Sequence, residues 1–189
     1  MKKKPLLCVF AGANEGKNIK YKSETIKLAK CLSAYSFKFI YGGSSKGLMG
    51  SFSNEIIKNN GNITGVIPSF LIEKETPNKN LSKLKIVKSM HQRKKLMYKN
   101  ANGFIALPGG LGTLDEIMEV LTWKQLQIIT APIFFLNIND YWRNLILLLE
   151  KIKKENFSHS NTIDHLIFEK EPYLLSKNII NMLYLNKQL

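Results

Sequence analysis

The sequence predicts an α/β fold built on a doubly wound, mostly parallel sheet with helices on both faces. Short apolar runs alternate with amphipathic stretches along the whole chain. The runs are continuously apolar, which is typical of parallel strands that are buried on both faces. No repeat, low-complexity tract or Pro/Gly-rich linker divides the 189 residues. We therefore predict a single domain over residues 1–189.

Seven apolar runs are predicted to be strands. The first run follows Met1 and three lysines, an arrangement that imitates a secretory signal. We interpret it as a strand because polar residues 14–17 stand where a cleavage site would be needed. Its removal would also take a strand from the core. The predicted strands are residues 6–11, 37–41, 63–67, 85–88, 104–107, 133–136 and 166–168.

The amphipathic stretches between these runs predict helices, whereas residues 69–82 are polar and predict a loop. In doubly wound folds, ligands bind beyond the carboxyl ends of the strands. The loops that follow the strands are therefore the segments in which to seek a site. The predicted helices are residues 23–34, 48–59, 89–101, a segment after the turn at 109–112, 141–155 and 174–185.

The chain is strongly basic, with 28 Lys and Arg against 14 Asp and Glu and a formal net charge of +14. Only Arg93 and Arg143 are arginines, and the lysines are spread along the chain. Arginine forks are the preferred readers of base edges, so we expect no nucleic-acid partner. A positive field still attracts anionic small molecules.

The cysteines and the hydropathy indicate the compartment. Cys8 lies in an apolar run and Cys31 in a helical pattern, which predicts two buried thiols in a reducing, cytoplasmic environment. No apolar stretch reaches the roughly 18 residues that span a bilayer, so no membrane association is expected. The three histidines lack metal-ligand spacing. We expect His91 to lie near the site, and His159 and His165 to lie on the surface.

Seven of the twelve glycines lie in two windows, residues 42–50 and 109–112, each directly after a predicted strand. Glycine permits close approach to a ligand, and the start of the following helix offers free N–H groups to a phosphate. The alternative is that tight turns simply require glycine. Residues 12–18 do not form a Walker phosphate loop, and Asp115 interrupts a dinucleotide fingerprint after Gly112. Kinase, NTPase and dehydrogenase activities are therefore disfavoured.

Two acids and one arginine are candidates for chemistry. Thr113 and Glu116 have the spacing of a helix capping box, which could explain both residues structurally. Otherwise Glu116 and Glu119 share the more open helix face and could stabilise a ribosyl oxocarbenium ion. In a lysine-rich chain, Arg93 suggests a fork for a carboxylate or phosphate, although it could also be a surface residue on a basic helix.

Three linked motifs follow one another along the chain. They are Tyr41-Gly42-Gly43-x-x-x-Gly47-Leu48-Met49-Gly50, Met90-His91-x-Arg93-Lys94 and Pro108-Gly109-Gly110-x-Gly112-Thr113-x-x-Glu116, followed by Thr122-Trp123-x-Gln125-Leu126. Together they resemble the Lonely Guy (LOG) family of cytokinin riboside 5'-monophosphate phosphoribohydrolases, often labelled lysine decarboxylases, and the resemblance spans essentially the whole chain. It implies a Rossmann-like homodimer, without metal or organic cofactor, that hydrolyses the N-glycosidic bond of AMP or an N6-substituted AMP.

The resemblance also assigns residues. Arg93 and Glu116 would be the catalytic pair, with Arg93 keeping Glu116 ionised, and Glu119 would lie near the ribose. Two positions depart from the family pattern: residues 11–14 replace a Cys-Gly-Ser-Ser-like turn, and Ser44 replaces a common glycine. These departures bear on base and ribose preference. The remaining substrate-binding residues would be Gly109, Gly110, Gly112 and Thr113 at the phosphate, together with Met90, Lys94, Gly43, Ser44 and Asn14.

Two other functions remain alternatives to hydrolysis. Relatives of the implied fold include molybdenum-cofactor carriers, so a non-hydrolytic nucleotide or cofactor carrier is possible; the presence of both Arg93 and Glu116 favours the enzyme. Pyridoxal-dependent decarboxylation, which the family label suggests, is disfavoured by the short chain.

Overall fold

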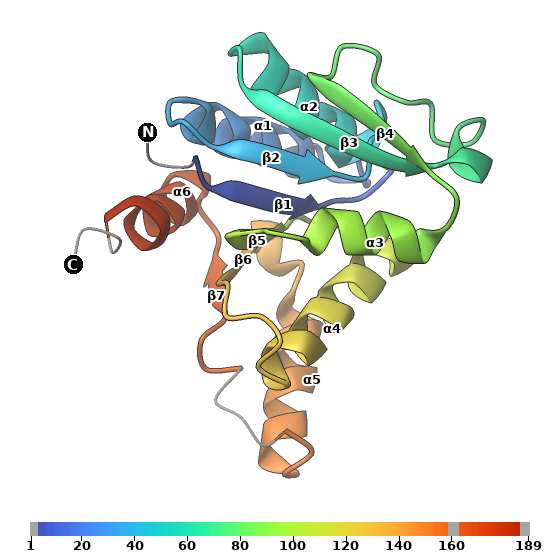
Figure 1. The fold of residues 1–189 in the computed structure, drawn as a ribbon. Coiled ribbons are helices and arrows are strands. Elements are labelled where there is room, and N and C mark those ends of the chain that lie inside the picture. Colours follow the sequence, from blue (N-terminus) through green and yellow to red (C-terminus); the bar gives the residue numbers. More distant parts are fainter. Residues whose placement is uncertain (1–3, 159–162, 186–189) are drawn as a thin grey trace.

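The computed structural model describes residues 4–158 and 163–185 (Figure 1). Its centre is a seven-stranded sheet in the order β4-β3-β2-β1-β5-β6-β7, and every neighbouring pair is parallel. This confirms the predicted fold class, and each predicted strand is present. The strands are β1 (Leu6–Phe10), β2 (Lys38–Tyr41), β3 (Asn62–Pro68), β4 (Lys83–Val87), β5 (Gly103–Ala106), β6 (Ile133–Leu136) and β7 (Ile167–Glu169).

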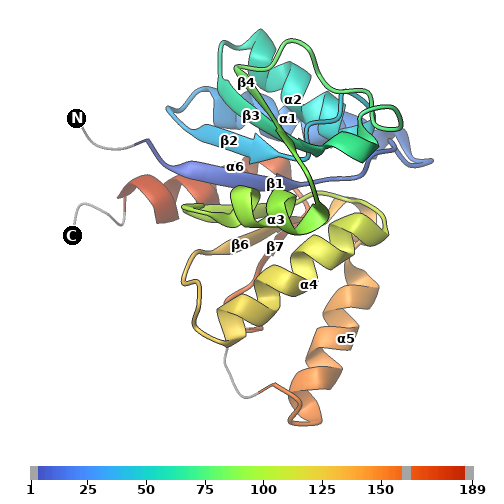
Figure 2. The ribbon, with the colours of Figure 1, turned by 45° about the vertical axis from the view of Figure 1, so that its right-hand side comes forward.

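Helices cover both faces of the sheet (Figures 1 and 2). Buried side chains of α1, α2 and α6 form one core layer, and those of α3, α4 and α5 form the other. Strand β1 shows why its run is continuously apolar: Leu7 and Val9 enter the first layer, whereas Cys8 and Phe10 enter the second. The helices are α1 (Ile19–Ser33), α2 (Gly47–Lys58), α3 (Met90–Tyr98), α4 (Leu111–Gln125), α5 (Arg143–Lys154) and α6 (Pro172–Ile180), with short turns at Ser69–Leu71, Ile138–Asp140 and Asn181–Leu185.

Helix boundaries differ from the predictions where a local contact overrides the apolar pattern. Helix α1 begins before residue 23 because the side chain of Asn18 accepts a hydrogen bond from the amide of Lys20 (3.0 Å) and caps the helix. Helix α3 ends at Tyr98, shortly before Asn100 adopts a left-handed φ of 63°. Helix α5 begins at Arg143, two residues later than predicted, because residues 141 and 142 still belong to the turn that follows the left-handed Asn139 and Asp140.

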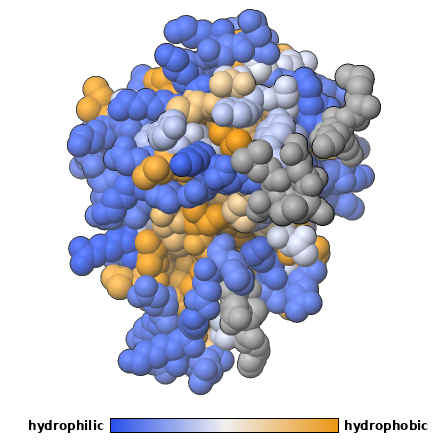
Figure 3. Space-filling model, turned by 90° about the vertical axis from the view of Figure 1, so that its left-hand side faces the viewer, coloured by the Kyte–Doolittle hydropathy of each residue, from blue (hydrophilic) through white to orange (hydrophobic). Residues whose placement is uncertain are grey.

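The surface and the two cysteines follow from the composition. Figure 3 shows a face that is mostly hydrophilic, with an apolar area between hydrophilic surfaces. Cys8 is buried as predicted, whereas Cys31 is only half-buried, and both thiols are free. No helix within residues 4–158 and 163–185 is both long and apolar enough to cross a membrane.

The strand order creates a crevice at the centre of the sheet. From β1 the chain proceeds outward through β2, β3 and β4, and then returns to the other side of β1 for β5, β6 and β7. The loop after β1 leads to α1 on one face, and the loop after β5 leads to α4 on the other. Loops that diverge in this way leave a ligand-sized opening at the carboxyl ends of the strands.

Candidate active site

A cavity of about 460 Å³ occupies this crevice. Its lining comes from the loop after β1, the turn between β5 and α4, and the starts of α2 and α3. The position agrees with the expectation that the site lies in the loops after the strands. Eight of the predicted site residues line the cavity: Asn14, Met90, Arg93, Gly109, Gly110, Gly112, Thr113 and Glu116.

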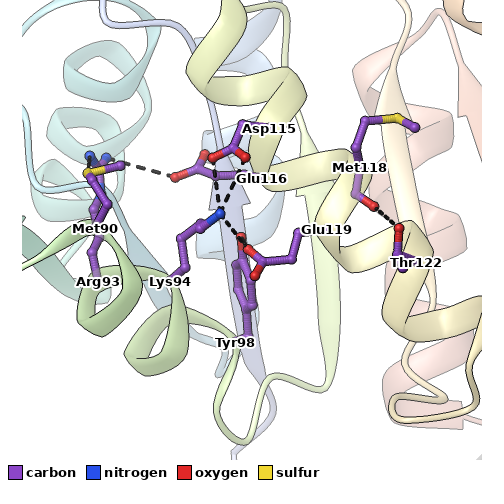
Figure 4. A network of polar contacts seen from close by, with 9 residues as sticks. All are labelled: Met90, Arg93, Lys94, Tyr98, Asp115, Glu116, Met118, Glu119 and Thr122. Atoms are coloured by element: carbon purple, nitrogen blue, oxygen red, sulfur yellow. Dashed lines mark hydrogen bonds and ion pairs between the residues drawn. The ribbon is translucent and has the colours of Figure 1, made fainter.

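Arg93 of α3 and Glu116 of α4 face each other in the cavity (Figure 4). Their Nη2 and Oε1 atoms are 3.9 Å apart, and the residues are only 5% and 6% exposed. The pair is therefore an ion pair without a direct hydrogen bond. Of the other guanidinium nitrogens, Nη1 donates to the sulfur of Met90 (3.9 Å), whereas the buried Nε has no partner among the described residues. An anionic ligand could satisfy the free donors.

Burial controls the charge of Glu116. The pKa of the carboxyl is raised from 4.5 to about 7 by several effects together: burial raises it most, Asp115 and Glu75 raise it as well, and Arg93 and Lys94 lower it. Arg93 thus favours the ionised form, as expected, but its effect on the pKa is smaller than that of burial. A carboxyl with a pKa near 7 can accept and return a proton at neutral pH.

The capping-box interpretation of Thr113 and Glu116 is wrong. Helix α4 begins at Leu111, Gly110 is its N-cap, and no side chain caps it. Thr113 therefore lies inside the first turn, where both it and Glu116 are buried and line the cavity. Neither the Thr113 hydroxyl nor the Glu116 carboxylate caps the helix, so a capping role does not explain why these two residues are present.

The first turn of α4 is suited to an anion. The first amides of a helix lack acceptors within the helix and carry its partial positive charge. Gly110 and Gly112 both line the cavity, and a Cβ placed on either residue would meet no atom within 4 Å. Backbone N–H groups are therefore open to a ligand here, as a bound phosphate requires.

Lys94 and Glu119, two of the predicted substrate-binding residues, do not line the cavity. Lys94 Nζ lies 2.8 Å from Glu119 Oε2 and 3.1 Å from Asp115 Oδ2, and the hydroxyl of Tyr98 donates to Glu119 Oε2 (3.1 Å). Figure 4 shows this network beside Glu116. It connects α3 to α4 and thus supports the approach of Arg93 to Glu116. Glu119 points to α3 instead of sharing an open face with Glu116.

Gly43 and Ser44 also lie outside the cavity lining. The Gly43 carbonyl accepts from the amide of Asn78 (3.0 Å), and the fully buried Ser44 accepts from the amide of Lys46 (3.1 Å). Their neighbour Gly42 is close to the site in another way, because a Cβ there would lie 2.0 Å from Arg93 Nη2. This loop therefore makes room for the arginine.

Tyr21, Glu75 and Tyr141 are among the lining residues that were not predicted from the sequence. Glu75 comes from the predicted loop 69–82, and its buried Oε2 has no hydrogen-bond partner among the described residues. No spacing or periodicity marks these residues in the sequence, so only the chain's path could reveal them.

The histidines and possible metal ligands add little to the site. His91 is exposed and does not line the cavity, although the preceding residue, Met90, does. His165 is exposed as predicted, and His159 lies outside the described residues. In the part of the chain that the structure describes, no three His, Cys, Asp or Glu side chains are grouped to hold a metal ion.

Solved structures with a similar fold show low sequence identity. The molybdenum cofactor carrier protein of Chlamydomonas reinhardtii matches with a TM-score of 0.72 and 15% identity over 96% of this chain and 99% of that one. The molybdenum cofactor binding protein of Rippkaea orientalis matches with a TM-score of 0.69 and 21% identity over 95% and 99%. These likenesses establish the fold alone.

Sequence relatives are much more similar. Cytokinin riboside 5'-monophosphate phosphoribohydrolase LOG1 of Arabidopsis thaliana is 40% identical over 161 residues, which are 85% of this chain and 75% of that protein. The probable phosphoribohydrolase LOGL6 of Oryza sativa subsp. japonica is 39% identical over 80% of this chain and 60% of its own length. The model of a family described as "Possible lysine decarboxylase" matches residues 49–179. On this identity and coverage, the chain belongs to the LOG family.

Proposed function

We propose that this protein hydrolyses the N-glycosidic bond of a nucleoside 5'-monophosphate, either AMP or an N6-substituted AMP such as a cytokinin riboside monophosphate. The products are the free base and ribose 5-phosphate. The observation that carries the proposal is the buried Arg93–Glu116 pair, 3.9 Å apart, in a cavity that also contains the start of α4. The names of the relatives, which are phosphoribohydrolases, support the same reaction.

The start of α4 would bind the phosphate. Its free amides and partial positive charge suit a phosphate, and the spaces beside Gly110 and Gly112 allow close approach. A phosphate held there would fix the nucleotide so that the ribose C1' lies beside Glu116. Such fixation makes the attack effectively unimolecular, which lowers the barrier.

Glu116 would act on the water and on the developing positive charge. In its ionised form it accepts a proton from the attacking water as the C1'–N bond breaks and the C1'–O bond forms. Its negative charge stabilises the oxocarbenium-like transition state. Arg93 holds the carboxylate in place and favours its ionised form. The departing base takes up one proton, which balances the proton that the water releases.

We also propose that the protein acts as a homodimer. Helix α4 and the turn after it expose three large apolar side chains, Met118, Leu126 and Ile128, at 38%, 61% and 62% of their areas. Large exposed apolar patches mark surfaces that contact a partner. Sedimentation equilibrium would give the mass of a dimer, and a monomeric mass at micromolar concentration would contradict this part of the proposal.

The test of the reaction is an assay for adenine and ribose 5-phosphate released from AMP and isopentenyl-AMP, with GMP and CMP for comparison. Glu116→Gln should lower kcat by about 100-fold or more, because it removes the base and the negative charge. Glu155→Gln, an exposed acid at the end of α5, is the matched control and should keep the parent rate. Unchanged turnover in folded Glu116→Gln protein would reject the assigned role, and a parent protein that releases no base would reject the reaction.

A further inference from the structure

Tyr141, in the turn after β6, reaches into the site from a segment that the proposed reaction does not use. It lines the cavity, and its hydroxyl donates a hydrogen bond to the carbonyl of Gly109. We propose that Tyr141 is a positioning residue that fixes the Gly109 carbonyl away from the phosphate, and so prepares the start of α4 to bind the anion. This inference rests on the proposed binding of phosphate at that helix start.

The turn that carries Tyr141 is built to hold one conformation. Asn139 and Asp140 are consecutive left-handed residues, with φ of 50° and 56°. Such conformations are uncommon outside glycine and persist only where surrounding contacts require them. One such contact is buried: the side-chain oxygen of Asn137 accepts from the amide of Trp142 (2.8 Å). Tyr141 therefore leaves the turn in a fixed direction.

The ring of Tyr141 packs against two other aromatic rings. It meets Trp142 edge to face, with ring centres 4.9 Å apart, and Tyr21 of α1 in the same manner at 5.6 Å. Trp142 is almost fully buried and packs in turn on Phe135 of β6. Aromatic pairs in this geometry are attractive beyond their buried area. The hydroxyl is thus presented to Gly109 by the core, although 39% of Tyr141 remains exposed.

The consequence for the helix start is electrostatic. A carbonyl oxygen carries partial negative charge, so one that turned toward the phosphate would repel it. Two successive carbonyls precede α4, and both are bound elsewhere: Pro108 accepts from the amide of Gly12 (3.0 Å), and Gly109 accepts from Tyr141. With both oxygens engaged, the N–H groups at the start of α4 remain for the anion.

The test compares ligands with and without the phosphate. Isothermal titration of parent and Tyr141→Phe protein would use AMP, inorganic phosphate and adenosine. The variant keeps the ring and loses only the hydrogen bond. We expect affinity for AMP and inorganic phosphate to fall about 5-fold, the size of one ordinary hydrogen bond, and affinity for adenosine to change less than about 2-fold. In turnover, KM for AMP should rise while kcat changes little.

The matched control is Tyr173→Phe, which removes an exposed hydroxyl on α6 outside the cavity and should leave all three affinities unchanged. Equal affinity of parent and Tyr141→Phe for AMP and phosphate, or an equal loss for adenosine, would overturn the inference. Since titration requires no turnover, a parent protein that binds AMP without cleaving it would reject the proposed reaction and still decide the role of Tyr141. A parent protein that binds neither AMP nor phosphate would overturn both.

Discussion

The two glycine-rich loops have similar compositions but serve the site differently. In the loop over residues 42–50, protein atoms occupy the space beside the glycines: a Cβ on Gly42 would meet Arg93, and one on Gly47 would lie 2.3 Å from the backbone of Ala13. In the loop over residues 109–112, Gly110 and Gly112 face open space. The first loop therefore shapes the protein around its own arginine, and the second leaves room for a ligand.

Among the substitutions that test this comparison of the two loops, we expect Gly42→Ala to have the largest effect on activity. The φ of Gly42 lies outside the left-handed region, so alanine fits the backbone, but its Cβ would lie 2.0 Å from Arg93 Nη2 and 2.8 Å from the sulfur of Met49. The guanidinium must therefore leave its place in the Arg93–Glu116 pair as it stands. We expect kcat/KM for AMP to fall roughly 100- to 1000-fold, because small misplacements of catalytic groups are costly.

A double-mutant cycle separates this displacement from general damage. In an Arg93→Ala background, where there is no guanidinium to displace, Gly42→Ala should cost little further activity. An equally large loss from Gly42→Ala in both backgrounds would show that the first loop does not act through the arginine.

A second prediction concerns Glu116, on the helix that follows the second loop. The pKa of its carboxyl is raised from 4.5 to about 7, mainly by burial. The folded protein therefore keeps a proton that the unfolded chain loses, and stability falls as the pH rises from about 4.5 to about 7. Glu116→Gln, which stays neutral, should match the parent near pH 5 and exceed its free energy of unfolding by roughly 2 to 3 kcal/mol at pH 8. Urea unfolding at both pH values measures this, and a stability difference independent of pH would contradict the raised pKa.

Gly47→Ala should mainly affect stability. Gly47 has a left-handed φ of 61°, and an added Cβ would contact the backbone of Ala13 and Asn14, which cannot yield as a side-chain tip can. We expect a loss of about 2 kcal/mol or more in the free energy of unfolding. The measurement is urea unfolding monitored by circular dichroism. A variant as stable as the parent would show that the first loop is not crowded by protein.

Gly112→Ala should have the smallest effect of these substitutions. In contrast to Gly47→Ala, it should weaken ligand binding and leave stability intact. Alanine favours the helix, so stability should stay constant or rise by about 0.5 to 1 kcal/mol. The added methyl group would enter space proposed for the phosphate, so affinity for AMP should weaken about 10-fold, with little change for adenosine. Titration with both ligands measures this. Reduced stability with unchanged AMP affinity would remove the contrast between the loops.

Most of the fold could be predicted from the sequence because it is encoded locally. Short segments rich in apolar residues indicated the strands, although β4 alternates lysine with apolar residues, and the order of these segments and the amphipathic stretches indicated a parallel sheet. Boundaries were less predictable where one contact decides them, as with the cap at Asn18 and the left-handed residues before α5. These contacts leave no periodic signal.

The site could be predicted in part. Arg93, Thr113 and Glu116 were identified from motifs, and the structure brings all three to one cavity. Glu75 and Tyr141 were missed, since an isolated acid in a polar loop and a tyrosine at a helix start are unremarkable in sequence. The neighbours of Lys94 and Glu119 were equally unpredictable, because their pairing depends on how α3 lies beside α4.

By itself, the sequence determined the kinds of elements, the strand-end turns rich in glycine and the motifs that mark the family. Hydrophobic period and turn chemistry act over a few residues, so they can be read without the rest of the chain. Only the tertiary structure decided that Arg93 approaches Glu116, that Gly42 makes room for the guanidinium, and that Tyr141 reaches Gly109. Each of these contacts joins separate elements, and the distance between such elements is fixed by strand order and by the packing of helices on the sheet.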